Sequence, residues 1–268
     1  QISNNHHRLL GFFNKIEKLI LEFKADITNF FSNFTLFNIV KSNKRVLLIF
    51  IENQMITIDS SIAHIITKYH CMEHKCHLYF LPEIKRFINI KLYNKFLKDI
   101  QENNIDENDF NDFRKEGENE SYLCRLIRND LIKDFIIYYN RTNLSISSKI
   151  PNSIFETNLF LIKNKPTLIE YAAFFGSIQI FRYLVMNNHG LSSSLWNYVV
   201  HSNNAELLHY LEELQLVQAN EAYDNYANES IKCFHNDFAN YIFDHYLDEQ
   251  SKINNQIKYL KYRNFNYI

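Results

Sequence analysis

Residues 70–77 bring together side chains that could bind a metal. The stretch reads His-Cys-Met-Glu-His-Lys-Cys-His. On a helix its three histidines would share one face, because they are spaced at four and three residues. Zinc accepts Cys and His ligands in tetrahedral sets. The candidate ligands are His70, Cys71, His74, Cys76 and His77.

The spacing of this cluster argues against a structural zinc site. Such sites draw two pairs of ligands from separated knuckles, and the sequence holds no second cluster of this kind. The alternative is a helix rich in thiols and aromatic residues whose histidines recur by coincidence. The sequence favours that alternative, so we expect no bound metal and no cofactor. A zinc-stabilised or metal-sensing helical domain that uses residues 70–77 stays as the competing hypothesis.

A second stretch, Cys233-Phe-His-Asn-Asp237, offers a thiol, an imidazole and a carboxylate, the groups of a covalent catalyst. On a helix Cys233 and His235 would face different sides, because they are two residues apart. Asp237 stands where neighbouring helical hairpins turn, so we expect it to cap a helix. The four glycines do not cluster into a phosphate-binding loop. These patterns predict a protein that is not an enzyme.

The composition predicts the elements that would position such residues. The chain has 268 residues, of which 46% are hydrophobic and 22% charged, so it can bury a core. Only 4 Gly and 3 Pro are present, too few for the many tight turns of sheet proteins. We therefore expect an all-α protein. The four cysteines are irregularly spaced, which indicates free thiols rather than disulfides.

The charge and the apolar runs limit the partners. The net charge is -1 and the isoelectric point is about 6.9, which does not favour a nucleic-acid surface. The longest apolar run, 46–51, is far shorter than the ~20 residues of a membrane span. No leader segment is recognisable. We expect a cytoplasmic protein that binds neither nucleic acid nor membranes.

The pattern along the chain predicts several regions. Apolar residues at helical spacing in 8–22, and again in 35–52 around a turn at Ser42-Asn43, indicate an N-terminal helical region over 1–105. Residues 102–120 hold eight acids against two bases, so we expect 106–120 to be a solvated acidic connector.

Residues 121–250 then show a recurring helical hairpin, and 251–268 form a helix or tail. In each hairpin two short apolar helices flank a turn, and the step between hairpins varies from 27 to 46 residues. Such hairpins bury their apolar faces only by stacking, which predicts a helical solenoid. The helix pairs are 122–128 with 131–139, 168–175 with 178–186, 195–201 with 205–214, and 231–235 with 239–247.

Residues 167–184 of this region resemble the core of an ankyrin repeat. Ala172 and Ala173 are small enough for adjacent repeats to approach closely, and Gly176 can take the positive φ of a tight turn. Leu168 and Glu170 depart from the pattern, because they stand where Pro and His are usual.

A wider resemblance covers nearly the whole chain. The sequence is similar to the large Trichomonas expansion of ankyrin-repeat proteins, whose N-terminal region is a domain of unknown function. This resemblance implies all-helical repeats, a protein-binding role and no catalytic residues. The stretches that carry it are His6-His7-Arg8, 37–45, 83–85, 127–129, 154–158, 167–184, 202–207 and 231–242.

The resemblance also indicates where a protein partner would bind. Phe174 and Phe175 occupy variable positions at the end of a first helix, and His201 and Ser202 occupy the equivalent positions in the next hairpin. These four residues are our candidate partner-binding site, although packing of the two phenylalanines inside the solenoid is the alternative. An uncapped solenoid end would expose apolar surface, so we also expect weak self-association.

Overall fold

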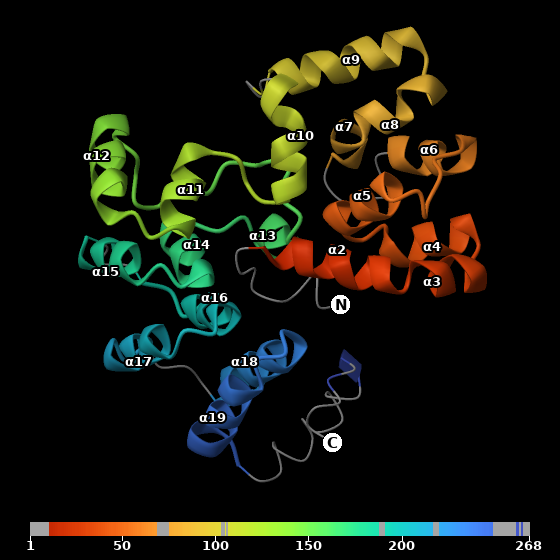
Figure 1. Cartoon of the computed structure of the whole chain (residues 1–268). Coiled ribbons are helices and arrows are strands. Elements are labelled where there is room, and N and C mark those ends of the chain that lie inside the picture. The colour runs from red at the N-terminus through yellow and green to blue at the C-terminus, as the bar shows by residue number, and fades with distance from the viewer. Residues whose placement is uncertain are drawn as a thin grey trace. The chain divides into compact units, whose positions relative to one another are not determined.

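A computed structural model describes residues 11–68, 75–102, 105, 107–187, 191–216, 220–248, 261–262 and 264; at 107–108 and 220–222 it describes only the backbone. Within these residues the chain is all-α, as predicted (Figure 1). Its β pairing there is limited to one isolated bridge between Lys149 and Thr167. Each of the described helices is too short or too polar to span a lipid bilayer.

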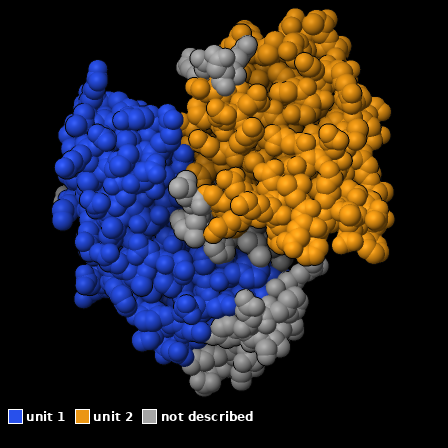
Figure 2. Space-filling model, in the orientation of Figure 1, with its two compact units in different colours: residues 1–7, 121–151, 163–268 blue, residues 8–120, 152–162 orange. Residues whose placement is uncertain are grey.

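The chain divides into two compact units, which Figure 2 shows in different colours. Unit 1 comprises residues 1–7, 121–151 and 163–268, and unit 2 comprises 8–120 and 152–162. The division at 120/121 is where the sequence pattern places the start of the repeated hairpins. After residue 121 the chain leaves unit 1 once more, at 152–162, to contribute a segment to unit 2.

The described residues of unit 1 form a series of four helical hairpins (Figure 1). The first helices of consecutive hairpins pack against one another in chain order, α11 on α14, α14 on α16 and α16 on α18. Each hairpin therefore contacts its neighbours in sequence, as expected of a solenoid. The hairpins are α11 (Tyr122–Arg128) with α12 (Ile132–Thr142), α14 (Leu168–Phe175) with α15 (Ile178–Met186), α16 (Leu195–Ser202) with α17 (Ala205–Glu213), and α18 (Asn220–Lys232) with α19 (Asn236–Tyr246).

The four turns share one backbone geometry. Each contains a left-handed residue, Asp130, Gly176, Asn203 or Phe234, with φ between 50° and 73°. In three turns the amide after this residue donates to the carbonyl five residues earlier, at 2.9–3.0 Å, which closes the first helix. The last turn lies at Phe234 rather than at 236–237, so the prediction that Asp237 caps a helix is wrong. Asp237 is in the first turn of α19.

In the last three hairpins the residue after the left-handed position ties its hairpin to the preceding one. Ser177 Oγ donates to Ile127 O at 2.5 Å, and His235 Nδ1 donates to Val200 O at 2.7 Å. The two acceptors are equivalent, because each lies three residues before a left-handed residue. Asn204 makes a related bond, from Nδ2 to the carbonyl of the preceding turn at 3.3 Å. A repeated hydrogen bond thus accompanies the repeated turn.

A tyrosine on each of the last three second helices repeats as well. Tyr183 packs edge-on against Phe135 with ring centroids 6.1 Å apart, and Tyr210 packs against Phe181 at the same distance. Tyr241 packs against His209 at 5.7 Å. Each tyrosine lies seven residues after its left-handed residue, so the three tyrosines have the same register as the turns.

The described part of unit 2 lacks such a repeat. Its helices α2 to α9 and the 3₁₀ turn η1 pack around a continuous apolar core that includes the aromatic rings of Phe37, Tyr79, Phe80 and Phe96. The predicted turn at Ser42-Asn43 is present, and the Asn43 side chain caps α5. The elements are α2 (Phe12–Glu22), α3 (Lys24–Phe30), α4 (Asn33–Val40), α5 (Lys44–Glu52), α6 (Ser60–Thr67), α7 (Cys76–Tyr79), α8 (Leu81–Ile84), η1 (Lys85–Phe87) and α9 (Ile90–Gln101).

The expected acidic connector is part of unit 2. Most of it forms helix α10 (Glu107–Glu116), in which Phe110 is buried and Arg114 is only 3% exposed. The Arg114 guanidinium pairs with Glu83 at 2.6 Å. The sequence pattern indicated a solvated connector because acids outnumber apolar residues in this stretch. Its mean polarity is therefore high, although Phe110 and Arg114 are buried.

The segment 152–162 completes the core of unit 2. Phe155 is fully buried, and its ring lies 5.4 Å from that of Phe110 and 6.4 Å from that of Tyr79. Thr157 donates from its side chain to Gly117 O at 2.8 Å. Helix α13 (Leu159–Asn164) then carries the chain back towards unit 1.

Candidate functional site

The four candidate partner-binding residues lie at the ends of α14 and α16, and three of them are buried. Phe174 is 1% exposed, His201 is 0% exposed and Ser202 is 9% exposed. Phe175 alone is half-buried. The Phe174 and His201 rings contact each other at 5.0 Å, so these two positions pack consecutive hairpins together. This packing is the alternative that the sequence left open for Phe174.

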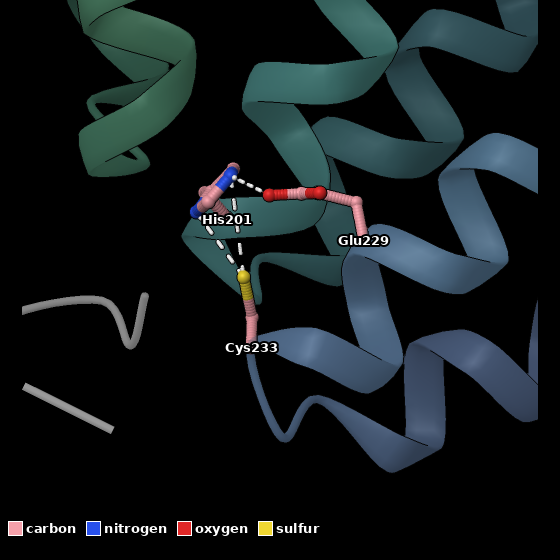
Figure 3. A group of neighbouring side chains, drawn as sticks. All are labelled: His201, Glu229 and Cys233. Atoms are coloured by element: carbon pink, nitrogen blue, oxygen red, sulfur yellow. Dashed lines mark hydrogen bonds and ion pairs between the residues drawn. The ribbon is translucent and has the colours of Figure 1, made fainter. Parts of the chain in front are cut away.

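His201 belongs to a cluster of three chemically reactive side chains, drawn in Figure 3. It projects from the end of α16 towards Glu229 on α18 and Cys233, the residue that directly follows α18. His201 Nε2 is 3.0 Å from Glu229 Oε1, and Nδ1 is 3.3 Å from Cys233 Sγ. Cys233 N donates to Glu229 O at 3.0 Å, so the carboxylate and the thiol are one helical turn apart and lie on the same side.

The cluster is electrostatically unusual for a helical core. Burial alone would raise the pKa of Glu229, but the hydrogen bond to His201 and the neighbouring charges of His201 and Lys232 lower it to about 2. Lys232 Nζ lies 2.9 Å from Glu229 Oε1. Burial raises the pKa of the Cys233 thiol well above its usual value. The folded protein therefore holds an ionised carboxylate beside a protonated thiol.

The order thiol, imidazole, carboxylate matches the nucleophile, base and orienting group of a cysteine hydrolase. Burial argues against that chemistry. A catalytic cysteine is an accessible thiolate with a lowered pKa, whereas Cys233 is fully buried and its pKa is raised. The residues can instead stabilise the contact between α16 and α18, or bind a cation through their sulfur, nitrogen and oxygen atoms.

The sequence spacing argued against a catalytic set of Cys233, His235 and Asp237. In the structure His235 donates to Val200 O and Asp237 is exposed, so neither partners the thiol. The true partner, His201, lies 32 residues earlier. Aligning the hairpins on their turns would have placed His201 on the helix end that packs beside α18. The side-chain geometry itself follows from helix packing, which spacing along the chain does not encode.

The stretch 70–77, which the competing hypothesis assigns to a metal, lies mostly outside the described residues, which resume at Lys75. Cys76 and His77 are buried on α7, and the His77 ring packs on that of Phe96 at 4.5 Å. Burial lowers the pKa of His77 to about 4, partly opposed by Asp99. These two residues are part of the unit 2 core, and the competing zinc hypothesis stays a prediction.

Two of the three basic residues at 41–45, Lys44 and Arg45, lie in the interior of unit 2. Lys44 is 4% exposed and its Nζ donates to Ile154 O at 2.6 Å. Arg45 is 3% exposed and its Nε donates to Lys115 O at 2.8 Å. These cations satisfy backbone carbonyls, so they do not form a basic surface.

An apolar depression of about 410 Å³ lies on α2 and α3 of unit 2. The exposed rings of Phe23, Phe30 and Phe31 contribute to its walls, and Phe30 is 82% exposed. Asp26 is its one charged lining residue. Nothing in the described part of the chain identifies what would cover this surface.

No family model, no curated protein and no solved structure matches this chain. Any functional assignment therefore rests on the side chains of this chain and their geometry.

Proposed function

We propose that the chain is a non-catalytic protein-interaction module that binds its partner through the turn end of the hairpins in unit 1. One observation carries this proposal. The four hairpins keep the same left-handed turn while the two residues before it change completely in chemistry. A repeat scaffold with separable core and contact positions suits partner recognition. The four pairs of changing residues are Arg128-Asn129, Phe174-Phe175, His201-Ser202 and Lys232-Cys233.

The burial of these pairs moves the proposed contact surface to the first two hairpins. Arg128 and Phe175 are half-buried, in contrast to Phe174 and His201. The Arg128 guanidinium lies 6.0 Å from the centre of the Phe175 ring and donates to the Tyr171 hydroxyl at 3.1 Å. The result is a pre-ordered cation beside an aromatic ring, and arginine and aromatic residues dominate interface energetics. It suits a partner that presents a carboxylate next to an apolar side chain.

Three further expectations belong to this proposal. The resemblance to the Trichomonas ankyrin-repeat expansion supports a protein-binding role, and a cytoplasmic location fits it. Weak self-association stays a prediction, which sedimentation velocity over a range of concentrations would test.

The proposal is tested by affinity capture with the full chain and three single variants. Phe175→Ala and Arg128→Ala remove the proposed contacts, while Ile137→Ala removes an apolar side chain that is 65% exposed on the second helix α12. We expect the same protein to be captured by the parent and by Ile137→Ala but lost from the other two. Circular dichroism confirms that each variant folds. Equal capture by all four chains would show that the turn end is not the contact surface.

A further inference from the structure

We propose that His201, Glu229 and Cys233 form a binding site for a zinc-like divalent cation between the third and fourth hairpins of unit 1. The three residues offer one nitrogen, one oxygen and one sulfur ligand, all within 4.8 Å of one another. Imidazole, carboxylate and thiolate together are a donor set typical of zinc, because hard cations such as Mg²⁺ and Ca²⁺ prefer oxygen alone.

The distances are close to those of a tetrahedral site. Zinc–ligand bonds of 2.0–2.3 Å at tetrahedral angles require ligand pairs about 3.4–3.6 Å apart. His201 Nε2 lies 3.0 Å from Glu229 Oε1 and 4.0 Å from Cys233 Sγ. Small side-chain rotations would equalise these separations. Three protein ligands leave the fourth position for water.

The surroundings suit a bound cation. The Phe174 ring covers one side of His201 and keeps that side of the cluster apolar. Glu229 is the member with solvent access, since its side chain is 20% exposed, and it gives an ion a route to the buried ligands. Binding would require Cys233 to release its proton, a step that zinc makes favourable.

Lys232 provides a sharp prediction. Its ammonium group lies 2.9 Å from Glu229 Oε1 and competes with any cation for that oxygen. Replacing Lys232 by a neutral residue should therefore tighten metal binding. A cluster that serves only to pack two helices would not gain metal affinity from this change.

The consequence for the protein is a link between consecutive repeats. His201 lies in the last turn of α16, Glu229 lies on α18 and Cys233 directly follows it, so the cation would join the third and fourth hairpins. Metal that binds only the folded state stabilises it in proportion to its concentration. The third and fourth hairpins would therefore be stabilised when the metal is present.

The test is a titration of the full chain with Co²⁺, a spectroscopic substitute for zinc. We expect one equivalent to bind with a thiolate-to-cobalt charge-transfer band, and Zn²⁺ to displace it. Cys233→Ala should abolish the band, while Cys124→Ala, which removes another buried thiol of unit 1, should retain it. His201→Gln and Glu229→Gln should each weaken binding at least tenfold. These two variants keep the test decisive if Cys233→Ala does not fold.

Two further comparisons complete the experiment. One uses Lys232→Gln, and the other uses alanine variants of Cys71 and Cys76. Lys232→Gln should bind Co²⁺ several-fold more tightly than the parent, and Lys133→Gln, which removes an exposed lysine on α12, should not. A band that disappears in Cys71→Ala or Cys76→Ala and survives in Cys233→Ala would place the metal at 70–77. That result, or the absence of any thiolate band, would overturn the proposal.

Discussion

Each of the two units is stabilised internally, and the kind of interaction that stabilises it differs between them. Unit 1 repeats one turn and one aromatic contact, and its hairpins contact their neighbours in sequence. Unit 2 is held by buried cations that donate to distant carbonyls, such as Lys44 to Ile154 O and Arg45 to Lys115 O. The difference teaches that local repetition and long-range polar contacts can each organise helices of similar length. It also predicts that the two units respond differently to substitution.

The largest effect should come from Arg114 in unit 2. Arg114→Ala would leave Glu83, its partner at 2.6 Å, as a largely buried and unpaired carboxylate. Removing one member of a buried ion pair costs about 3–5 kcal/mol in the free energy of unfolding. Urea unfolding, with hydrogen exchange at the amides of α5 and α7, measures the loss. Lys98→Ala is the control, because it breaks an exposed pair and should cost less than about 1 kcal/mol. If Arg114→Ala and Lys98→Ala lowered the free energy of unfolding equally, unit 2 would not depend on its buried cations.

Acid should weaken unit 2 through His77. The pKa of its imidazole falls from 6.5 to about 4 on folding, chiefly because burial disfavours the charged form. Between these values the unfolded chain binds a proton that the folded chain does not, so stability falls as the pH drops from 6.5 to 4. The slope from one group is at most about 1.4 kcal/mol per pH unit.

His77→Leu should remove this contribution to the slope while retaining an apolar contact with Phe96. Urea midpoints at several pH values between 4 and 7 measure it. The His209→Leu variant is the control, because His209 is exposed on α17 and should leave the slope of unit 2 unchanged. An unaltered slope in His77→Leu would show that another group senses acid in unit 2.

The comparison also explains how much of the molecule the sequence predicts. The hairpins of unit 1 follow from apolar spacing and turn residues, and three of the four turns lie where these indicate. Asn203 and Asp130 tolerate a left-handed backbone and mark their turns. Phe234 does not, and the fourth turn was therefore placed too late. Local chemistry reveals a turn only when the residue at the left-handed position is one that favours it.

Contacts between distant segments could not be predicted in the same way. Nothing near Ile154 in the sequence indicates that its carbonyl accepts from Lys44, 110 residues earlier. The contact of His201 with Cys233 could not be predicted for the same reason, since the two residues belong to different hairpins and only packing brings them together. Of the candidate site, spacing identified His201 and Cys233 as separate features and missed Glu229.

In unit 1 the largest effect should come from the small residues between stacked first helices. Ala173 is fully buried on α14, which packs against α16, so Ala173→Leu should cost about 1–3 kcal/mol through overpacking. The protein has one tryptophan, Trp196 on α16, and its fluorescence reports unfolding of this unit. Ala205→Leu, at an exposed position, should change stability by less than about 0.5 kcal/mol. If Ala173→Leu and Ala205→Leu had the same unfolding midpoint, the first helices would not be closely packed at Ala173.

The smallest effects should separate turn geometry from turn residue. Gly176 has φ of 73°, and an added Cβ would meet the Asn204 side chain at 3.4–3.6 Å, which is no serious clash. Gly176→Ala should therefore cost only the backbone preference, about 1 kcal/mol. Asn203→Gly, at φ of 52° in the next hairpin, should change stability by a few tenths of a kcal/mol, since asparagine already tolerates this conformation. Trp196 fluorescence measures the unfolding midpoint of each variant. If Gly176→Ala and Asn203→Gly shifted this midpoint equally, the two turns would not share the left-handed constraint that recurs in unit 1.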